Sequence, residues 1–301
     1  FYAFLYRKLC KIAVLTEGLP DIMYAHYLNY MYYGIQLQKQ FNIPLVGIEH
    51  WSEMGKRDIQ LSTIQQAQQI YSQLDQLIVV SSALKQNILT KTKLNTPIHI
   101  VNNMVGKEFA YTSLCKNTSL KMVSTGSLIY RKGYDLLIKA LSQINDLPEN
   151  WQLLIIGDGI LKSTLKQSII EHGLQNNIKL VGKKNKNQIA EIFRNSDFFV
   201  LPSRNETFGV VYIEALACGL PIIATDCGGP SDIITKENGI LVPCENVDAL
   251  KEAIRYMIAN LSTYNNQAIA DECQARFSPE VIAQQLTTIF EETRNKHKSS
   301  S

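Results

Sequence analysis

Short apolar runs alternate with stretches of helical periodicity along almost the whole chain. This alternation is typical of α/β proteins, in which helices cover a mainly parallel sheet. In the first part of the chain, the apolar runs predict strands at Asp21–His26, Pro44–His50, Leu77–Ser81 and Pro97–Val101. The stretches around Leu28–Phe41, Asp58–Tyr71 and Ser82–Thr90 predict helices between these strands.

The second part of the chain repeats the pattern over a longer stretch. Its apolar runs predict strands at Leu120–Ser124, Trp151–Gly157, Ile178–Gly182, Asp197–Pro202, Pro221–Asp226 and Gly239–Val242. This number of strands, each followed by a helix or a polar turn, makes a complete Rossmann-like domain, whereas the first part is short.

The polar segment Tyr111–Ser119 lacks periodicity and is interpreted as the linker between two domains. We therefore expect Rossmann-like domains at residues 1–112 and 120–301. Ser278 and Pro279 predict the N-cap and first position of a final helix, which could cross back to the first domain. The polar tail Lys296–Ser301 is expected to be disordered.

Composition agrees with two globular domains and excludes several other classes. A length of 301 residues suits about two domains, and 46% hydrophobic with 19% charged residues excludes a disordered chain. The formal net charge of +3 does not require a nucleic-acid partner. The longest apolar stretch, Phe208–Ala224, is interrupted by Glu214, Gly219 and Pro221, so no membrane span is expected.

The six cysteines form no Cys-x-x-Cys pair. A metal site or a redox cluster is therefore not expected, and the cysteines are interpreted as reduced, small hydrophobic residues of a cytosolic protein.

The most informative stretch for chemistry follows the predicted strand Asp197–Pro202. The segment Gly209–Ala217 is apolar nearly all round, so its helix should be buried, and Glu214 is its only charge. A buried carboxylate needs a partner, which is either an internal ion pair or capping contact, or the hydroxyl groups of a ligand. The free N–H groups at the start of this helix, near Phe208 and Gly209, suit an anion. Together these features suit a nucleotide diphosphate and its ribose.

Other residues that follow predicted strands offer weaker signals. Arg131 and Lys132, just before Gly133, could neutralise a diphosphate or simply be surface cations. The glycines at Gly157–Gly159 and Gly228–Gly229 permit either a close approach of a ligand or a tight turn.

Histidines end two of the predicted strands in the first part of the chain. His50 and, with weaker support, His26 are placed where a site between two domains would be, or they are ordinary core or surface histidines.

The chain has no Asp-x-Asp, no P-loop and no Gly-x-Gly-x-x-Gly, which argues against a carboxylate-held metal, a P-loop NTPase and an ordinary dehydrogenase.

The run from Ser203 through Glu206 and Glu214 to Pro221 closely resembles the E-x(7)-E motif of retaining glycosyltransferases of group 1 (family 4), which have the two-Rossmann GT-B architecture. Further matches are Gly126…Lys132-Gly133, Gly157-Asp158-Gly159, Gly228-Gly229, Pro20-Asp21-Ile22…His26, Ile43-Pro44…Glu49-His50-Trp51 and Val79-Val80-Ser81. The resemblance covers almost the whole chain.

The resemblance implies a role for each matching residue. Glu214 would hold the ribose hydroxyls, and Glu206 would face the donor sugar and its developing positive charge. The amides of Phe208 and Gly209, with Lys132, would hold the diphosphate. The base would meet the backbone from Gly182 to Lys184, and the transferred sugar would contact His50. The family is described without a protein nucleophile, because the leaving diphosphate takes the proton of the acceptor.

Two positions depart from the family pattern. Ser127 stands where the family usually has an arginine, for which Arg131 is a substitute. No glycine-rich strand and loop precede Asp21, so the first domain is expected to be incomplete.

The resemblance therefore implies an enzyme that moves a sugar from a nucleotide-diphosphate sugar to a glycan or lipid-linked acceptor in surface polysaccharide biosynthesis. No metal, cofactor or nucleic acid is expected, and the location is expected to be cytoplasmic. The alternatives are a non-catalytic or truncated GT-B nucleotide-sugar-binding module and a GT-B sugar-nucleotide epimerase.

The segment Phe1–Lys11 interleaves aromatic residues with cations, as a helix at a membrane surface or a helix packed on a Rossmann core would do.

Overall fold

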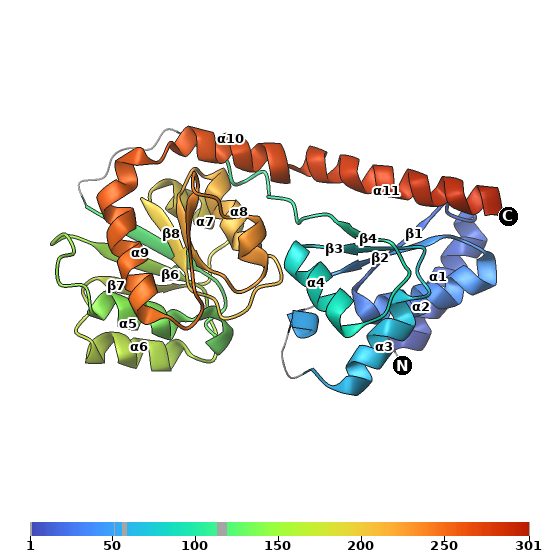
Figure 1. The fold of residues 1–301 in the computed structure, drawn as a ribbon, viewed down its shortest axis with the longest axis horizontal. Helices are drawn as coiled ribbons and strands as arrows, with labels where there is room; N and C mark the ends of the chain where they lie inside the picture. The colour runs from blue at the N-terminus through green and yellow to red at the C-terminus, as the bar shows by residue number, and fades with distance from the viewer. Residues whose placement is uncertain (1, 51, 56–58, 113–118, 301) are drawn as a thin grey trace. The chain divides into compact units, whose positions relative to one another are not determined.

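The computed structural model describes residues 2–50, 52–55, 59–112 and 119–300 (Figure 1). The chain divides into two compact units, unit 1 with residues 1–102 and 280–301, and unit 2 with residues 103–279. Each contains one parallel sheet with helices packed on it.

Unit 1 contains a four-stranded parallel sheet of order β1-β2-β3-β4. The strands are β1 Met23–His26, β2 Leu45–Glu49, β3 Gln76–Val79 and β4 Ile98–Ile100. The helices are α1 Tyr2–Glu17, α2 Tyr27–Phe41, α3 Leu61–Tyr71, α4 Ser82–Lys91 and α11 Pro279–Ser300, with a short 3₁₀ turn at Ser52–Gly55. β2 and β3 are buried along their whole length because each has a neighbouring strand on both sides.

Unit 2 contains a six-stranded parallel sheet of order β10-β9-β8-β5-β6-β7. Its strands are β5 Lys121–Thr125, β6 Gln152–Ile156, β7 Ile178–Gly182, β8 Phe198–Leu201, β9 Ile222–Thr225 and β10 Gly239–Val242. Its helices are α5 Tyr134–Ser142, α6 Lys162–Glu171, α7 Lys186–Arg194, α8 Val210–Ala217, α9 Val247–Asn260 and α10 Asn266–Phe277, with 3₁₀ turns at Tyr130–Lys132, Gly229–Asp232 and Leu261–Thr263. The strand order reverses between β5 and β8, and ligands of such sheets bind beyond the carboxyl ends at that point.

The strands expected from the apolar runs are all present, with ends that differ by at most two residues. The helix expected at Asp58–Tyr71 begins at Leu61, and Asp58 lies outside the described residues. The helix expected from Leu28 begins one residue earlier, at Tyr27.

The boundaries between the units differ from those expected at residues 112 and 120. Residues 103–112 group with unit 2 because they pack on it: the Val105 N–H donates to the Phe277 carbonyl at 2.9 Å, and the Phe109 ring lies 6.0 Å from that of Phe193. Most of the expected linker, residues 113–118, lies outside the described part of the chain.

The final helix groups with unit 1. Along α11, the Phe290 ring contacts that of Tyr24 at 5.1 Å, and Nε2 of His297 donates to the Asn42 carbonyl at 2.9 Å. The expectation of disorder at Lys296–Ser301 is wrong as far as Ser300, because the helix continues to that residue and is tied to unit 1 through His297.

Candidate functional site

Tight contacts between loops shape the carboxyl edge of the unit 2 sheet. A Cβ on Gly157 would lie 1.9 Å from the Gly126 carbonyl oxygen, and a Cβ on Gly159 would lie 2.5 Å from that of Leu128. These glycines therefore allow the loops after β5 and β6 to touch, a role that differs from the ligand approach and the tight turn considered from the sequence.

The loop after β5 brings two cations to a carboxylate from the loop after β8. Lys132 Nζ forms an ion pair with Glu206 Oε1, and the Arg131 guanidinium lies 3.6 Å from Glu206 Oε2. The Ser203 hydroxyl donates to Glu206 Oε1 at 2.8 Å. The side chains of Lys132 and Glu206 are only 10% and 7% exposed, so this pair lies in an environment with little water. The structure thus brings together three of the residues that the sequence predicted for the site.

The backbone of Glu206 is held from the opposite side by the turn after β9. The Glu206 N–H donates to the Cys227 carbonyl at 3.4 Å, and the Gly229 N–H donates to the Glu206 carbonyl at 2.9 Å. A Cβ on Gly229 would lie 2.3 Å from the Phe208 Cα, so glycine is needed there for the two loops to approach.

Helix α8 begins directly beyond this cluster, as the sequence predicted. Gly209 precedes it in a left-handed conformation (φ 97°), and the apolar helix is largely buried. The Phe208 side chain is also buried and packs edge-to-face on Phe277 at 5.8 Å. Phe208 and Gly209 can therefore meet a ligand only through their backbone N–H groups.

Glu214 lies one to two turns into α8 and is half-buried. Burial raises its pKa to about 7; the charge of Glu108 adds to this rise, and the charge of Lys186 opposes it. Among the described residues, no cation lies within ion-pair distance of this carboxylate and no side chain hydrogen-bonds to it. The internal ion pair that the sequence left open is thus not formed in the described part of the chain.

Gly182 and Lys184, expected near a nucleotide base, lie at the end of β7 and in the loop after it. Gly182 has a left-handed conformation (φ 73°), and a Cβ added to it would meet no atom within 4 Å. Lys184 is exposed. The backbone here is open to a ligand.

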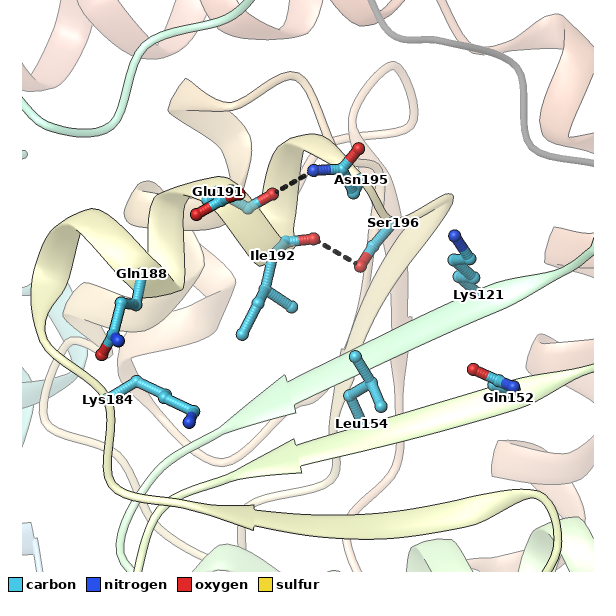
Figure 2. A pocket seen from close by; sticks show the side chains of 9 residues that line it. All are labelled: Lys121, Gln152, Leu154, Lys184, Gln188, Glu191, Ile192, Asn195 and Ser196. Carbon is cyan, nitrogen blue, oxygen red and sulfur yellow. Dashed lines mark hydrogen bonds between the residues drawn. The ribbon is translucent and has the colours of Figure 1, made fainter.

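Lys184 also borders a hollow of about 400 Å³ between α7 and strands β5 and β6 (Figure 2). The other residues around it are Lys121, Gln152, Leu154, Gln188, Glu191, Ile192, Asn195 and Ser196. Lys121 and Gln152 begin their strands, so the hollow extends to the amino edge of the sheet, away from the usual ligand side. The side chains of Asn195 and Ser196 donate hydrogen bonds to carbonyls of α7, so they already have partners at the end of that helix. We therefore place the candidate site at the Glu206 cluster.

Arg204 is part of the site region and was not singled out from the sequence. Its guanidinium forms a bidentate pair with Asp135 at 2.7 and 2.8 Å, contacts Glu245 at 2.5 Å and stacks on the Tyr130 ring at 3.8 Å. It thereby ties the loop after β8 to those after β5 and β10. Its partners are distant in sequence, so only its place beside Glu206 could have drawn attention to it.

His50 lies on unit 1, at the end of β2 and among other rings. It stacks on His26 at 5.4 Å and contacts the Tyr27 ring at 5.3 Å. Burial, followed by the neighbouring His26, lowers the pKa of His50 to about 4, so the imidazole is neutral at physiological pH. Its backbone N–H donates to Oε1 of the buried Glu49 at 2.9 Å, and Tyr71 donates to the other oxygen at 2.8 Å. Both predicted histidines thus meet at the carboxyl edge of the unit 1 sheet.

Tyr27 has a positive φ of 64°, which is rare for a bulky residue. Strain of this kind accumulates at functional sites more often than elsewhere, and here it holds an aromatic ring against His50.

The described residues contain neither a metal-binding cluster nor a membrane span. No group of three or more His, Cys, Asp or Glu side chains in that part of the chain is arranged to hold a metal ion. None of the described helices combines the length and apolar character needed to cross a bilayer.

Comparison with known proteins assigns the family. Residues 111–271 match the family model described as Glycosyl transferases group 1. An uncharacterized glycosyltransferase of Methanocaldococcus jannaschii is 32% identical over 263 residues, covering 84% of this chain and 69% of the relative. A GDP-mannose-dependent phosphatidylinositol monomannoside mannosyltransferase of Corynebacterium glutamicum is 30% identical over 184 residues, covering 58% of this chain and 48% of the relative. The chain thus spans about half to two thirds of the length of these relatives, and it belongs to the group 1 glycosyltransferase family.

Solved structures agree on the architecture. Sucrose-phosphate synthase from Thermosynechococcus elongatus has a TM-score of 0.84 at 22% identity, covering 95% of this chain and 77% of that one. Anabaena HepE in complex with UDP has a TM-score of 0.82 at 19% identity, covering 95% of this chain and 81% of that one. The two parallel sheets and these neighbours establish the GT-B fold with two Rossmann-like domains that the sequence predicted.

Proposed function

We propose that this glycosyltransferase moves a sugar from a nucleotide-diphosphate sugar to a glycan or lipid-linked acceptor, with retention of the anomeric configuration. The observation that carries the proposal is the cluster of Arg131, Lys132 and Glu206 beside the start of α8. Cations and free helix N–H groups suit a diphosphate, and a carboxylate at the same place suits positive charge that develops on a sugar.

In this proposal, Lys132 changes its ion-pair partner from Glu206 to the diphosphate when the donor binds. Without a donor, Lys132 is neutralised by Glu206. A diphosphate at the start of α8 carries more negative charge than one carboxylate and competes for the ammonium, which leaves Glu206 to face the sugar. Arg131, 39% exposed and already turned towards Glu206, supplies the second cation in place of the arginine that Ser127 replaces.

The nucleoside part of the donor would lie along α8 and the end of β7. Glu214 has no partner among the described residues, and two ribose hydroxyls would donate to its carboxylate. The base would contact the open backbone from Gly182 to Lys184. The donor complexes of Anabaena HepE contain UDP or UDP-glucose, which supports a nucleotide of this kind.

The reaction would need no protein nucleophile, metal or cofactor. The bond between the anomeric carbon and the diphosphate oxygen breaks, and the acceptor oxygen bonds to that carbon on the same face. The acceptor proton passes to the departing diphosphate oxygen. His50, neutral at physiological pH, would hydrogen-bond the transferred sugar.

Names of relatives support an acceptor bound to lipid. One relative is a phosphatidylinositol monomannoside mannosyltransferase, and another, from Saccharomyces cerevisiae, is the GPI3 subunit of a phosphatidylinositol N-acetylglucosaminyltransferase. We propose a role in surface polysaccharide biosynthesis at the cytoplasmic side of a membrane, with peripheral contact.

Calorimetric titration with UDP, GDP and ADP tests the donor site. Lys132→Met would remove the nearest cation from the buried Glu206 and leave it with the more distant Arg131. The double variant K132M/E206Q removes both charges of the buried pair and is therefore the suitable probe. We expect its nucleotide affinity to fall at least tenfold. Lys139→Met removes an exposed cation from the adjacent α5 and should change nothing. Unchanged affinity in the folded double variant would contradict the proposed diphosphate site.

Turnover separates the transferase from the other two candidates. Incubation with donor and acceptor should yield free nucleotide and a glycosylated acceptor. Formation of an isomeric nucleotide sugar without acceptor would identify an epimerase instead. Nucleotide binding without turnover, in a chain extended to the length of its relatives, would identify a binding module.

A further inference from the structure

Cys227 and Cys244 are separated in sequence but lie opposite each other in unit 2. The parallel pairing of β9 with β10 places Thr225 opposite Val242, and the ladder continues with the Asp226 N–H, which donates to the Val242 carbonyl at 2.8 Å. Each cysteine comes two residues after its member of the Thr225–Val242 pair. Cys244 lies beside the peptide group that precedes Cys227, because its thiol donates to the Asp226 carbonyl at 3.3 Å. Both cysteines lie just beyond the ends of neighbouring parallel strands. Such strands are about 4.8 Å apart, and the Cα atoms of disulfides are about 4.4–6.8 Å apart.

The two thiols differ in chemical character. The neighbouring Cys227 thiol lowers the pKa of Cys244 to about 7, against opposing effects of burial, Asp226 and Glu245. The Cys244 thiol, together with burial and the charge of Glu206, raises the pKa of Cys227. A thiol whose pKa is near the ambient pH is the best attacking group in thiol–disulfide exchange.

Both loops that carry the thiols are anchored, so the pair is held in place. On one side, the Cys227 carbonyl accepts from the Glu206 N–H. On the other side, Glu245, which follows Cys244, accepts a hydrogen bond from the Arg204 guanidinium at 2.5 Å. The Cys244 thiol also contacts the Asp226 carbonyl at 3.3 Å.

Exposure distinguishes this pair from the other cysteines of unit 2 that the structure describes. Cys227 and Cys244 are partly exposed, whereas Cys218 and Cys273 are fully buried, and burial raises the pKa of each of the latter to about 12. A dissolved oxidant can thus reach the pair but not the buried cysteines.

We propose that Cys227 and Cys244 are a modification site that a small-molecule disulfide, such as oxidised glutathione, converts reversibly into a disulfide that fastens the loop bearing Glu206. The Cys244 thiolate attacks one sulfur of the oxidant, forming a mixed disulfide and releasing one glutathione thiolate. Cys227 then attacks the Cys244 sulfur, and its proton passes to the second glutathione that leaves. One oxidant is reduced to two thiols while two cysteine thiols become one disulfide.

The proposal goes beyond the sequence-based expectation, which inferred from the missing Cys-x-x-Cys pair that a redox cluster is not present. The absence of a Cys-x-x-Cys motif says nothing about cysteines that meet across neighbouring strands. The site does not depend on the transferase activity proposed above.

The test treats the folded, reduced chain with buffers of oxidised and reduced glutathione and maps the products by peptide mass spectrometry. We expect a peptide pair linked through Cys227 and Cys244 that reduced glutathione reverses. In Cys227→Ser, the reaction should stop at a glutathione adduct on Cys244. In Cys244→Ser, the adduct on Cys227 should form at least tenfold more slowly. Cys218 and Cys273 should stay unmodified in every sample.

Hydrogen exchange of the same samples tests the effect on the site. The amides of Glu206 and Gly229 should exchange several-fold more slowly in the oxidised chain than in the reduced chain. Absence of the linked peptide, or a glutathione adduct preferentially on Cys227, would overturn the assignment of the pair. Equal exchange in both states would overturn the connection to the Glu206 loop.

Discussion

Charges at the candidate site neutralise each other before any ligand arrives. Lys132 and Glu206 form a pair that is about nine-tenths buried, with Arg131 at its margin. Removing one member of a buried pair costs more than removing both, because a lone charge remains in a place with little water. A nucleotide diphosphate can therefore replace Glu206 as the partner of Lys132, and this exchange underlies the first prediction.

Glu206→Gln should lower both stability and turnover. Lys132 loses its negative partner, so we expect destabilisation by about 3 kcal/mol, largely restored by bound UDP or GDP. The loss of charge facing the sugar should reduce kcat strongly with a modest change in donor affinity. Thermal unfolding with and without nucleotide, and steady-state kinetics, measure both effects. The matched control is Glu149→Gln, at an exposed position. Equal losses in kcat/KM and nucleotide affinity would indicate a merely structural carboxylate.

Glu214 should make nucleotide affinity depend on pH. Its pKa of about 7 means that much of the carboxyl is protonated below neutrality, whereas two ribose hydroxyls need the carboxylate as acceptor. Affinity should thus weaken up to about tenfold from pH 8 to pH 6. Glu214→Ala should lower affinity about ten- to a hundredfold at pH 8 and remove that part of the pH dependence. Calorimetry on the folded variant checks this, and unchanged affinity would contradict the ribose role.

The same carboxyl should lower stability at higher pH. Its folded pKa of about 7 is above the ordinary 4.5, so between these values the folded state binds a proton that the unfolded chain has lost. Stability is then lost as pH rises through 7. Glu214→Gln should stabilise the chain at pH 8 by at most about 3 kcal/mol and much less at pH 5. Urea unfolding at both pH values measures the difference, and an equal effect at both would exclude the carboxyl as its source.

At the scale of elements, the loops after β5 and after α6 contain glycines for two different reasons. Gly133 and Gly173 have nearly the same conformation, with φ of 67° and 70°. A Cβ on Gly133 would lie 2.0 Å from the Pro202 carbonyl oxygen, whereas a Cβ on Gly173 meets nothing within 4 Å. The comparison separates the cost of contact from the cost of backbone strain.

Gly133→Ala should be much more destabilising than Gly173→Ala. The second variant has only the strain of a left-handed alanine, about 1 kcal/mol, whereas the first must also move the loops after β5 and β8 apart. We expect the difference to exceed about 2 kcal/mol in urea unfolding. Similar losses in both variants would mean that the loops can separate easily.

Helix α1 has exposed apolar side chains at Leu9, Ile12 and Leu15, close to the cations Lys8 and Lys11. This arrangement suits contact with an anionic membrane surface, where each cation contributes roughly 1 kcal/mol. We expect the chain to pellet with anionic vesicles at low salt, and to do so less at high salt or when Leu9 and Leu15 are changed to Ser. The absence of pelleting at low salt would end the membrane interpretation.

At the scale of the whole molecule, the sequence predicted what is local and missed what is distant. Hydrophobic periodicity marked the strands because burial imposes it on neighbouring residues. Lys132 and Glu206 were singled out because each follows a strand end, where parallel sheets bind ligands, and because both belong to stretches that resemble the family. The contacts of Arg204 with Asp135 and Glu245, and the meeting of Cys227 with Cys244, depend on strand order. No local pattern contains that order.

The boundary of the first unit was missed for a similar reason. Residues 103–112 carry no clear periodicity, and only packing such as that of Phe109 on Phe193 assigns them to unit 2. The roles of individual site residues remain predictions, because they depend on a donor that the fold alone does not supply.

The return of α11 has a consequence for biosynthesis. Unit 2 is continuous in sequence, whereas unit 1 needs residues from both sides of it. A ribosome therefore releases every residue of unit 2 before it has made the helix that packs beside Tyr24 and Asn42. Unit 1 is therefore completed only after unit 2 has been synthesised. Until then the side of unit 1 that contacts α11 stays uncovered, and at this stage of translation chaperones have most to protect.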